Sequence, residues 1–242
     1  MSTVIKSITN EAIQGYSEPF LCTTEDNIEY YVKGLRSRRD SQINEWICGN
    51  IAQALNLPIA PFRLLTVPDY LYEELPASAK GIGLGDCFGS QAEIDTALFE
   101  INDIHQVSLS LQTRIAAFDW LVKNGDRTKG NPNLLYRPHD KINSVIIIDH
   151  NLAFDKSFNS SIFLETHIFA DAFKKIFTDC VLQAEISSYL MQALPAYRAA
   201  CDNLPSKWEW MNEECDLPTN YDFQFAEATL ARLTNGQLWR LT

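Results

Sequence analysis

The chain carries the stretch NGDRTKGN at residues 124–131, and the stretch IDHNLAF follows at residues 148–154. Asp126 and Asn131 have the spacing Asp-x-x-x-x-Asn in a polar loop, and Asp149 ends a very apolar run. Phosphoryl transfer needs a carboxylate that orients or deprotonates the acceptor hydroxyl, together with Asp and Asn oxygens that hold Mg²⁺ on a triphosphate. The two stretches therefore predict a phosphoryl-transfer site. Asp126 and Asn131 are its candidate catalytic residues, and Asp149 and Asn131 its candidate metal ligands.

Each stretch also has a purely structural interpretation. Asn-Gly and Asn-Pro are common turn dipeptides, so the loop around Asp126 taken alone is equally compatible with an ordinary polar turn. Asp149 follows the apolar run 145–148, where a buried carboxylate needs a counter-charge. Bound Mg²⁺ supplies that charge, and the alternative is an aspartate that caps the strand or the next helix. The two stretches together favour the functional interpretation.

The N-terminal part of the sequence predicts strands and one helix, from alternating and helical spacing of its apolar residues. The strands are predicted over residues 11–19 (a short strand with a turn), 20–23, 28–33 and 62–67, and the helix over residues 42–56. The segment 76–90 carries four glycines and predicts a loop that connects two lobes.

The C-terminal part predicts a helix over residues 110–123, then a pair of strands, then helices. The strands are predicted over 134–136 and 145–148, and the later helices over 170–177, 182–193 and 223–233. The sequence therefore predicts an α+β fold of the two-lobe, protein-kinase-like type, with one domain over residues 1–242. A β-rich N-lobe is expected over about residues 1–80, and a mostly helical C-lobe over about residues 90–242.

Four further residues are candidates for nucleotide binding. Lys33 closes the strand 28–33, where a kinase places the lysine that grips the α- and β-phosphates, and Glu45 in the next helix is its candidate partner. A solvated hairpin end and a helix-start acid are the alternatives. Gly15 and Ser17 lie between the first two predicted strands, where a backbone N–H and a hydroxyl could meet a phosphate.

Composition limits the partners. The formal net charge of -11, from 20 basic and 31 acidic residues, disfavours binding to nucleic acid and to anionic membranes. No apolar run is long enough for a membrane span, and the N-terminus lacks the apolar core of a signal peptide, so a cytoplasmic location is expected. The six cysteines form no Cys-x-x-Cys pair and are expected to be reduced and mostly buried.

At these residues the sequence resembles the HipA-like kinases, which share their site plan with the phosphatidylinositol 3- and 4-kinases. Residues 31–33 resemble the nucleotide-lysine strand of that family, and residues 44–59 its following helix. Residues 126–131 resemble its catalytic loop, and residues 148–154 are similar to its metal-binding Ile-Asp-x-Gly-x-Ala-Phe motif. Two positions depart from the pattern: Thr128 stands where many relatives carry histidine, and Asn151 replaces the usual glycine.

The resemblance implies an ATP- and Mg²⁺-dependent kinase that transfers the γ-phosphoryl group to a hydroxyl, with Ser or Thr of a protein as the expected acceptor. A pseudokinase that holds nucleotide without transfer is the alternative, which Thr128 and Asn151 motivate. A third possibility is transfer of AMP on the same fold. A regulatory partner protein is compatible with the family, and the sequence does not identify one.

Overall fold

The computed structural model describes residues 3–11, 19–140 and 144–241. Helices and strands both contribute, which confirms the α+β class. The chain divides into two compact units. The first unit comprises Met1–Trp46, Ala60–Ile94 and Asn203–Tyr221. The second comprises Ile47–Ile59, Asp95–Asp202 and Asp222–Thr242.

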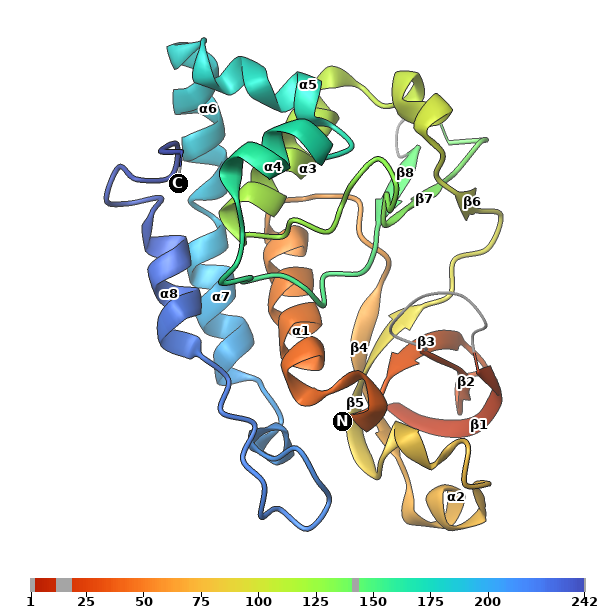
Figure 1. The fold of residues 1–242 in the computed structure, drawn as a ribbon. Helices are drawn as coiled ribbons and strands as arrows, with labels where there is room; N and C mark the ends of the chain where they lie inside the picture. Colours follow the sequence, from red (N-terminus) through yellow and green to blue (C-terminus); the bar gives the residue numbers. More distant parts are fainter. Residues whose placement is uncertain (1–2, 12–18, 141–143, 242) are drawn as a thin grey trace. The chain divides into compact units, whose positions relative to one another are not determined.

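The first unit contains a closed barrel of five strands in the order β1-β2-β3-β5-β4 (Figure 1). All neighbouring strands are antiparallel except β1 and β4, which run parallel. The strands are β1 (Thr3–Glu11), β2 (Phe20–Thr24), β3 (Glu29–Lys33), β4 (Phe62–Val67) and β5 (Gly85–Gln91), and the short helix α2 (Asp69–Glu74) follows β4.

Along barrel strands such as β2, side chains alternate between buried and partly exposed positions, and the buried ones form the core of the barrel. Every second residue of β2 is buried, and Phe20, Cys22, Tyr30 and Val32 all pack in one cluster with residues of β4 and β5. Closure removes the exposed strand edges that an open sheet of this size would present. The barrel is therefore held by apolar burial on its inside and by ladder hydrogen bonds around its circumference.

Most of the local predictions for this unit are confirmed. The strands β2 and β3 form the expected hairpin, β4 has the expected bounds, and helix α1 (Arg39–Ala54) begins three residues before the predicted 42–56. The first strand ends at Glu11 instead of starting there, and the rest of the segment 11–19 lies mostly outside the described residues.

The prediction of a connecting loop over residues 76–90 is wrong at its end, because β5 occupies Gly85–Gln91. Gly89 lies between Val32 and Arg63 in the ladder, so close to the Leu65 side chain that a Cβ would not fit. A glycine inside a strand marks such a close approach. Gly89, one of the four glycines that suggested a loop, is thus required by the close packing of β5 against Leu65.

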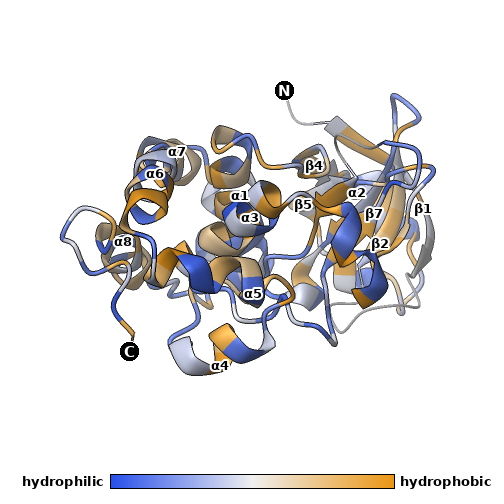
Figure 2. Cartoon of the chain, turned by 90° about the horizontal axis from the view of Figure 1, so that it is seen from above, coloured by the Kyte–Doolittle hydropathy of each residue, from blue (hydrophilic) through white to orange (hydrophobic). Residues whose placement is uncertain are grey.

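The second unit consists mainly of helices. They are α3 (Leu109–Leu121), α4 (Ser160–Thr166), α5 (Ala170–Phe173), α6 (Cys180–Leu190), α7 (Ala193–Asp202) and α8 (Phe223–Ala231). A small antiparallel sheet joins β6 (Ala97–Leu98), β7 (Leu134–Tyr136) and β8 (Val145–Ile147). The predicted helix 110–123, the paired strands and the later helices are confirmed. Hydrophobic residues, orange in Figure 2, gather on strands and helices, and the connecting loops are mostly blue.

Helix α3 forms the centre of the second unit. All of its residues from Gln112 to Leu121 are buried except Arg114, so most of the helix lies inside the unit. The Trp120 ring contacts Phe158, Phe163, Phe173 and Phe177, with centroid distances of 5.4 to 5.7 Å. Each such aromatic pair adds about 1 kcal/mol beyond area burial. The end of α3, which leads into the loop at 124–131, is therefore rigidly placed.

The structure also bears on membrane-spanning segments and on the burial of the cysteines. No helix in the described part of the chain is long and apolar enough to cross a membrane. All six cysteines are thiols, but only Cys22, Cys48 and Cys87 are buried, so the expectation of mostly buried thiols holds for half of them.

Candidate active site

Asp126 is placed by the end of helix α3. The helix ends with Lys123 in the left-handed conformation (φ 52°), which turns the chain sharply into the polar loop. The half-buried Asp126 carboxylate then accepts two hydrogen bonds on Oδ2, from Asn131 Nδ2 at 2.9 Å and from Asn133 Nδ2 at 2.8 Å. Its second oxygen, Oδ1, has no donor within the described residues, so it is the atom that can meet an acceptor hydroxyl.

Asn131 is exposed at the tip of the same loop. Its backbone N–H donates to the carbonyl and to the Oγ1 of Thr128, at 3.2 and 3.1 Å, and its carbonyl accepts from the Thr128 N–H at 2.9 Å. Thr128 therefore closes the turn that presents Asn131. Because the amide nitrogen of Asn131 faces Asp126, the amide oxygen is the atom left to hold a cation.

Asp149 lies two residues after the end of β8 and is half-buried, with φ at 57°. Asp and Asn tolerate the left-handed region better than most residues. Further along this loop, Phe154 has φ at 55°, which is a genuine outlier for a bulky side chain. The Phe154 N–H donates to the Val122 carbonyl at 2.7 Å, so the loop that carries Asp149 is bonded to the end of α3. Strained backbone of this kind concentrates at functional sites.

Arg127 joins the two loops. It is fully buried, and its Nη1 donates to the carbonyls of Pro132, Asn133 and Ile148, at 3.4 and 3.2 Å for the first and last. The Ile148 N–H also donates to the Asn133 carbonyl at 3.1 Å. One guanidinium thus fixes the backbone beside Asp126 to the residue that precedes Asp149, which brings the candidate catalytic and metal-binding segments together.

Asp119 supplies the counter-charge for Arg127. Its fully buried carboxylate accepts from Arg127 Nε at 2.7 Å, from Asn124 Nδ2 at 2.9 Å and from His167 Nε2 at 3.1 Å. His167 Nδ1 accepts the Phe169 N–H, so the imidazole is the neutral tautomer that donates through Nε2. Burial alone would raise the pKa of Asp119, but Arg127 and His167 lower it to about 2. The carboxylate is therefore ionised wherever the protein is folded near neutral pH.

The neutral His167 makes this buried network sensitive to acid. Burial lowers the pKa of His167 below its ordinary value of 6.5. Just below pH 6.5, the unfolded chain therefore binds a proton at this imidazole and the folded chain does not. The contribution of His167 to the free energy of unfolding is therefore complete above pH 6.5, and it decreases as the pH falls, by up to about 1.4 kcal/mol per pH unit.

The variant His167→Gln, whose amide can still donate to Asp119, tests this pH dependence. Between pH 7.5 and 5.5, urea denaturation should show a smaller decrease in the free energy of unfolding for this variant than for the wild type. His105 is exposed, so His105→Gln should show the same decrease as the wild type. A wild-type decrease in His167→Gln would contradict the assignment of His167 as a neutral, buried imidazole.

Lys33 and Glu45 lie in the first unit. Lys33 ends β3 and Glu45 is on α1, and their side chains form a buried ion pair, with 9% and 4% of their side-chain surfaces exposed. Gln42 Nε2 donates to the Gly34 carbonyl at 2.7 Å and so ties the residue after Lys33 to the same helix. The structure therefore pairs the two residues as the sequence suggested, and their role toward a nucleotide stays a prediction. Gly15 and Ser17 lie outside the described residues.

Within the described residues, no group of three or more His, Cys, Asp or Glu side chains is arranged to hold a metal ion. Mg²⁺ at phosphoryl-transfer sites needs only one or two carboxylates, because waters and substrate phosphates complete its octahedron. Asp149 with the Asn131 amide oxygen fits that donor set, and both belong to segments that Arg127 and Asn133 hold together.

A family model for HipA-like kinases matches residues 5–242, nearly the whole chain. The chain belongs to the HipA-like kinase family. No protein in a search of curated proteins matches it. The resemblance seen in the sequence is confirmed, and the HipA-like kinase is a phosphotransferase in the general sense of that family. Membership implies ATP as a ligand and usually a divalent cation.

Sequence reasoning missed four residues of the HipA-like kinase that position the site, namely Asp119, Arg127, Asn133 and His167. One signal was available: Asp119 stands inside the apolar stretch 115–122, where a buried charge must have a partner. Nothing local marks His167 as that partner, because the two residues are 48 positions apart.

Proposed function

We propose that this HipA-like kinase transfers the γ-phosphoryl group of ATP to a Ser or Thr hydroxyl of a protein, with Mg²⁺, on a two-lobe kinase-like fold. The N-lobe would cover about residues 1–80 and the C-lobe about residues 90–242. The observation that carries the proposal is the Asp126 carboxylate, held through Oδ2 by Asn131 and Asn133 while Oδ1 stays available. A strand barrel in one unit and a mainly helical second unit support the division into lobes.

Each candidate site residue has one proposed role in binding or transfer. Lys33 would hold the α- and β-phosphates, and Glu45 would orient its ammonium group. Asp149 and the Asn131 amide oxygen would hold Mg²⁺, which neutralises charge that develops on the phosphates. Asp126 Oδ1 would orient the acceptor hydroxyl and take its proton as the new oxygen–phosphorus bond forms and the bond from the γ-phosphorus to the β–γ bridging oxygen breaks, which leaves ADP.

A pseudokinase is the second candidate function. Thr128 and Asn151 motivate it, since both depart from the family pattern. The Thr128 side chain nevertheless accepts a hydrogen bond from the Asn131 N–H and so keeps Asn131 in position, which supports an active kinase. AMP transfer is a variant of the first function, in which the α-phosphorus would be attacked and pyrophosphate would leave.

The test is incubation of the purified protein with Mg²⁺ and either γ-labelled or α-labelled ATP, with and without a cell lysate. Label from γ-ATP on a protein band, absent with Asp126→Ala, is the expected result. Label from α-ATP alone would indicate AMP transfer. A thermal shift with Mg-ATP but no label from either nucleotide would support the pseudokinase, and the absence of both signals would contradict nucleotide binding itself.

Lys33→Met should lower kcat/KM for ATP on the order of 10²-fold, because a preorganised charge on the phosphates is lost. The change also leaves Glu45 buried without its cation, which destabilises the protein. The double variant Lys33→Met, Glu45→Gln removes that unpaired charge, so it should regain stability and stay slow. Lys6→Met, an exposed change on the same barrel, is the control for initial rates at varied ATP. Full recovery of rate in the double variant would show that Lys33 acts through stability alone.

A further inference from the structure

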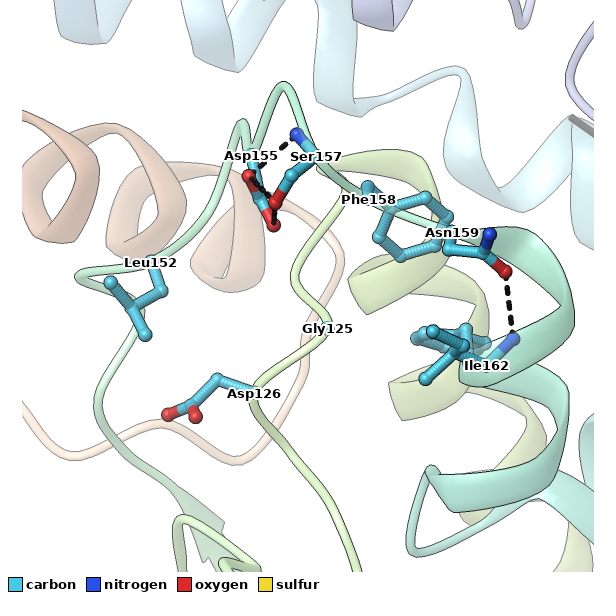
Figure 3. A pocket seen from close by; sticks show the side chains of 9 residues that line it. Gly125, Asp126, Leu152, Asp155, Ser157, Phe158, Asn159 and Ile162 are labelled. Carbon is cyan, nitrogen blue, oxygen red and sulfur yellow. Dashed lines mark hydrogen bonds between the residues drawn. The ribbon is translucent and has the colours of Figure 1, made fainter.

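A pocket opens beside Asp126 in the second unit (Figure 3). Its volume is about 270 Å³. Leu152 lies on the side of Asp126, and Phe158 and Ile162 lie across from them in this view. The lining residues are Gly125, Asp126, Leu152, Asp155, Ser157, Phe158, Asn159, Ile162 and Phe163. Gly125, Asp126 and Leu152 belong to the stretches 124–131 and 148–154, but the phosphoryl-transfer roles proposed above use only Asp126 among the lining residues.

The walls of the pocket are apolar and partly open to solvent. Leu152 and Ile162 have 55% and 58% of their surfaces exposed, whereas Phe163 at 2% forms a buried base. Exposed large apolar side chains are ordinary when scattered, but these two converge on one concavity beside a candidate catalytic residue. Such a surface gains free energy when another apolar group covers it.

Three polar residues of the pocket, Asp155, Ser157 and Asn159, already have hydrogen-bond partners among the lining residues. Asn159 Oδ1 accepts the Ile162 N–H at 2.9 Å and so caps α4, and Asp155 Oδ1 accepts the Ser157 N–H and Oγ–H at 2.8 and 2.7 Å. Two carboxylates, Asp126 and Asp155, face the space, and none of the lining residues is basic. The pocket thus favours an apolar occupant and disfavours an acidic or phosphorylated one.

We propose that this pocket binds a large apolar side chain of the acceptor protein, within two residues of the Ser or Thr that is phosphorylated. The inference rests on the proposed function, because it takes Asp126 as the residue that meets the acceptor hydroxyl. Asp126 lines the pocket, and extended chain advances about 3.3 Å per residue, so only near neighbours of the hydroxyl can reach it. The volume lies below the about 300–1,000 Å³ of sites for whole small molecules and suits one side chain.

The first experiment is a peptide array with a central Ser or Thr, varied flanking residues and γ-labelled ATP. The wild type should label peptides with Leu, Ile, Met or Phe at one position within two residues of the acceptor at least about fivefold more than glycine peptides, with Asp and Glu lowest. Ile162→Ala should lose most of this preference. Val181→Ala is the matched control, because Val181 is also an exposed apolar residue at the start of a helix, α6, and does not line the pocket.

A charge change gives a sharper test than truncation. Leu152→Lys adds an ammonium group to a pocket whose only charged lining groups are carboxylates, so the preference at the same position should move toward Asp and Glu. Because the readout is a ratio between peptides, a general loss of rate does not affect it. Labelling without any apolar preference, or a preference that both pocket variants retain, would overturn the pocket assignment while the kinase function stands.

A second measurement covers the case in which no peptide is labelled. Saturation-transfer NMR would compare N-acetyl-leucyl-serine amide with its glycyl and aspartyl analogues on the wild type and on Ile162→Ala. A stronger signal for the leucyl compound, reduced in Ile162→Ala, would support the pocket even though transfer to peptides had failed. Equal signals for all three compounds would overturn the pocket, independently of the proposed function.

Discussion

Asp149→Asn should reduce phosphoryl transfer by at least about 10³-fold while the protein stays folded. The change removes the charge that would hold Mg²⁺ but keeps the size of the side chain. Asparagine also tolerates the left-handed backbone at this position, where φ is 57°, so the loop has no new strain. Initial rates with γ-labelled ATP over a range of Mg²⁺ concentrations, with a circular dichroism melt of the same sample, measure both parts of the prediction.

Asp95→Asn is a closely matched control for Asp149→Asn. Asp95 has φ at 55° and is exposed in the same unit, so the chemical change and the backbone conformation are alike. The control should keep the wild-type rate. A wild-type rate in Asp149→Asn, or an equal loss in both variants, would remove Asp149 from the site.

Arg127→Met should destabilise the protein by about 3–5 kcal/mol, since it leaves the buried Asp119 carboxylate without its guanidinium. The carbonyls of Pro132, Asn133 and Ile148 lose the hydrogen bond from Arg127 in the same step, although that of Asn133 still accepts the Ile148 N–H. Urea denaturation followed by circular dichroism measures the shift in midpoint. Methionine keeps most of the side-chain volume, so the loss reports the charge and hydrogen bonds more than a cavity.

Arg114→Met is the control for Arg127→Met, because Arg114 is exposed on α3 and lies over the Tyr189 ring. Its expected cost is below about 1 kcal/mol. Adding Asp119→Asn to Arg127→Met removes the unpaired charge and should recover part of the stability. If the double variant were less stable than Arg127→Met alone, the buried carboxylate would not be the source of the loss.

The parts of the fold that follow from local pattern were predictable from the sequence. The alternation of apolar and polar residues predicted the hairpin β2–β3, and the helical spacing of apolar residues predicted α1 and α3. The loop at 124–131 was visible because it interrupts apolar sequence on both sides. By contrast, β5 was missed because its glycines suggested a loop, and the need for Gly89 arises only once β3 and β4 lie on either side of it.

The candidate site could be predicted from the sequence to a similar extent. Asp126, Asn131 and Asp149 stand out by residue type and spacing, whereas the network that fixes them joins residues far apart in the chain. Asp119 and His167 meet only after α3 and the segment after α4 have packed, and no local pattern encodes that contact. Asn133, which holds Asp126 beside Asn131, looks in the sequence like one more turn residue.

The bonds that Arg127 makes bear on how the protein moves. Loops that carry catalytic groups usually belong to the least stable part of an enzyme and open without global unfolding. Here the loop of Asp126 is bonded, through one buried side chain, to the Asp119 carboxylate at the centre of the unit. Separating it from the backbone at Ile148 would expose a buried charge, so amide protons on both loops should exchange with solvent only through a shared, costly opening. In the proposed kinase, the loops of Asp126 and Asp149 would therefore keep their positions relative to each other during turnover.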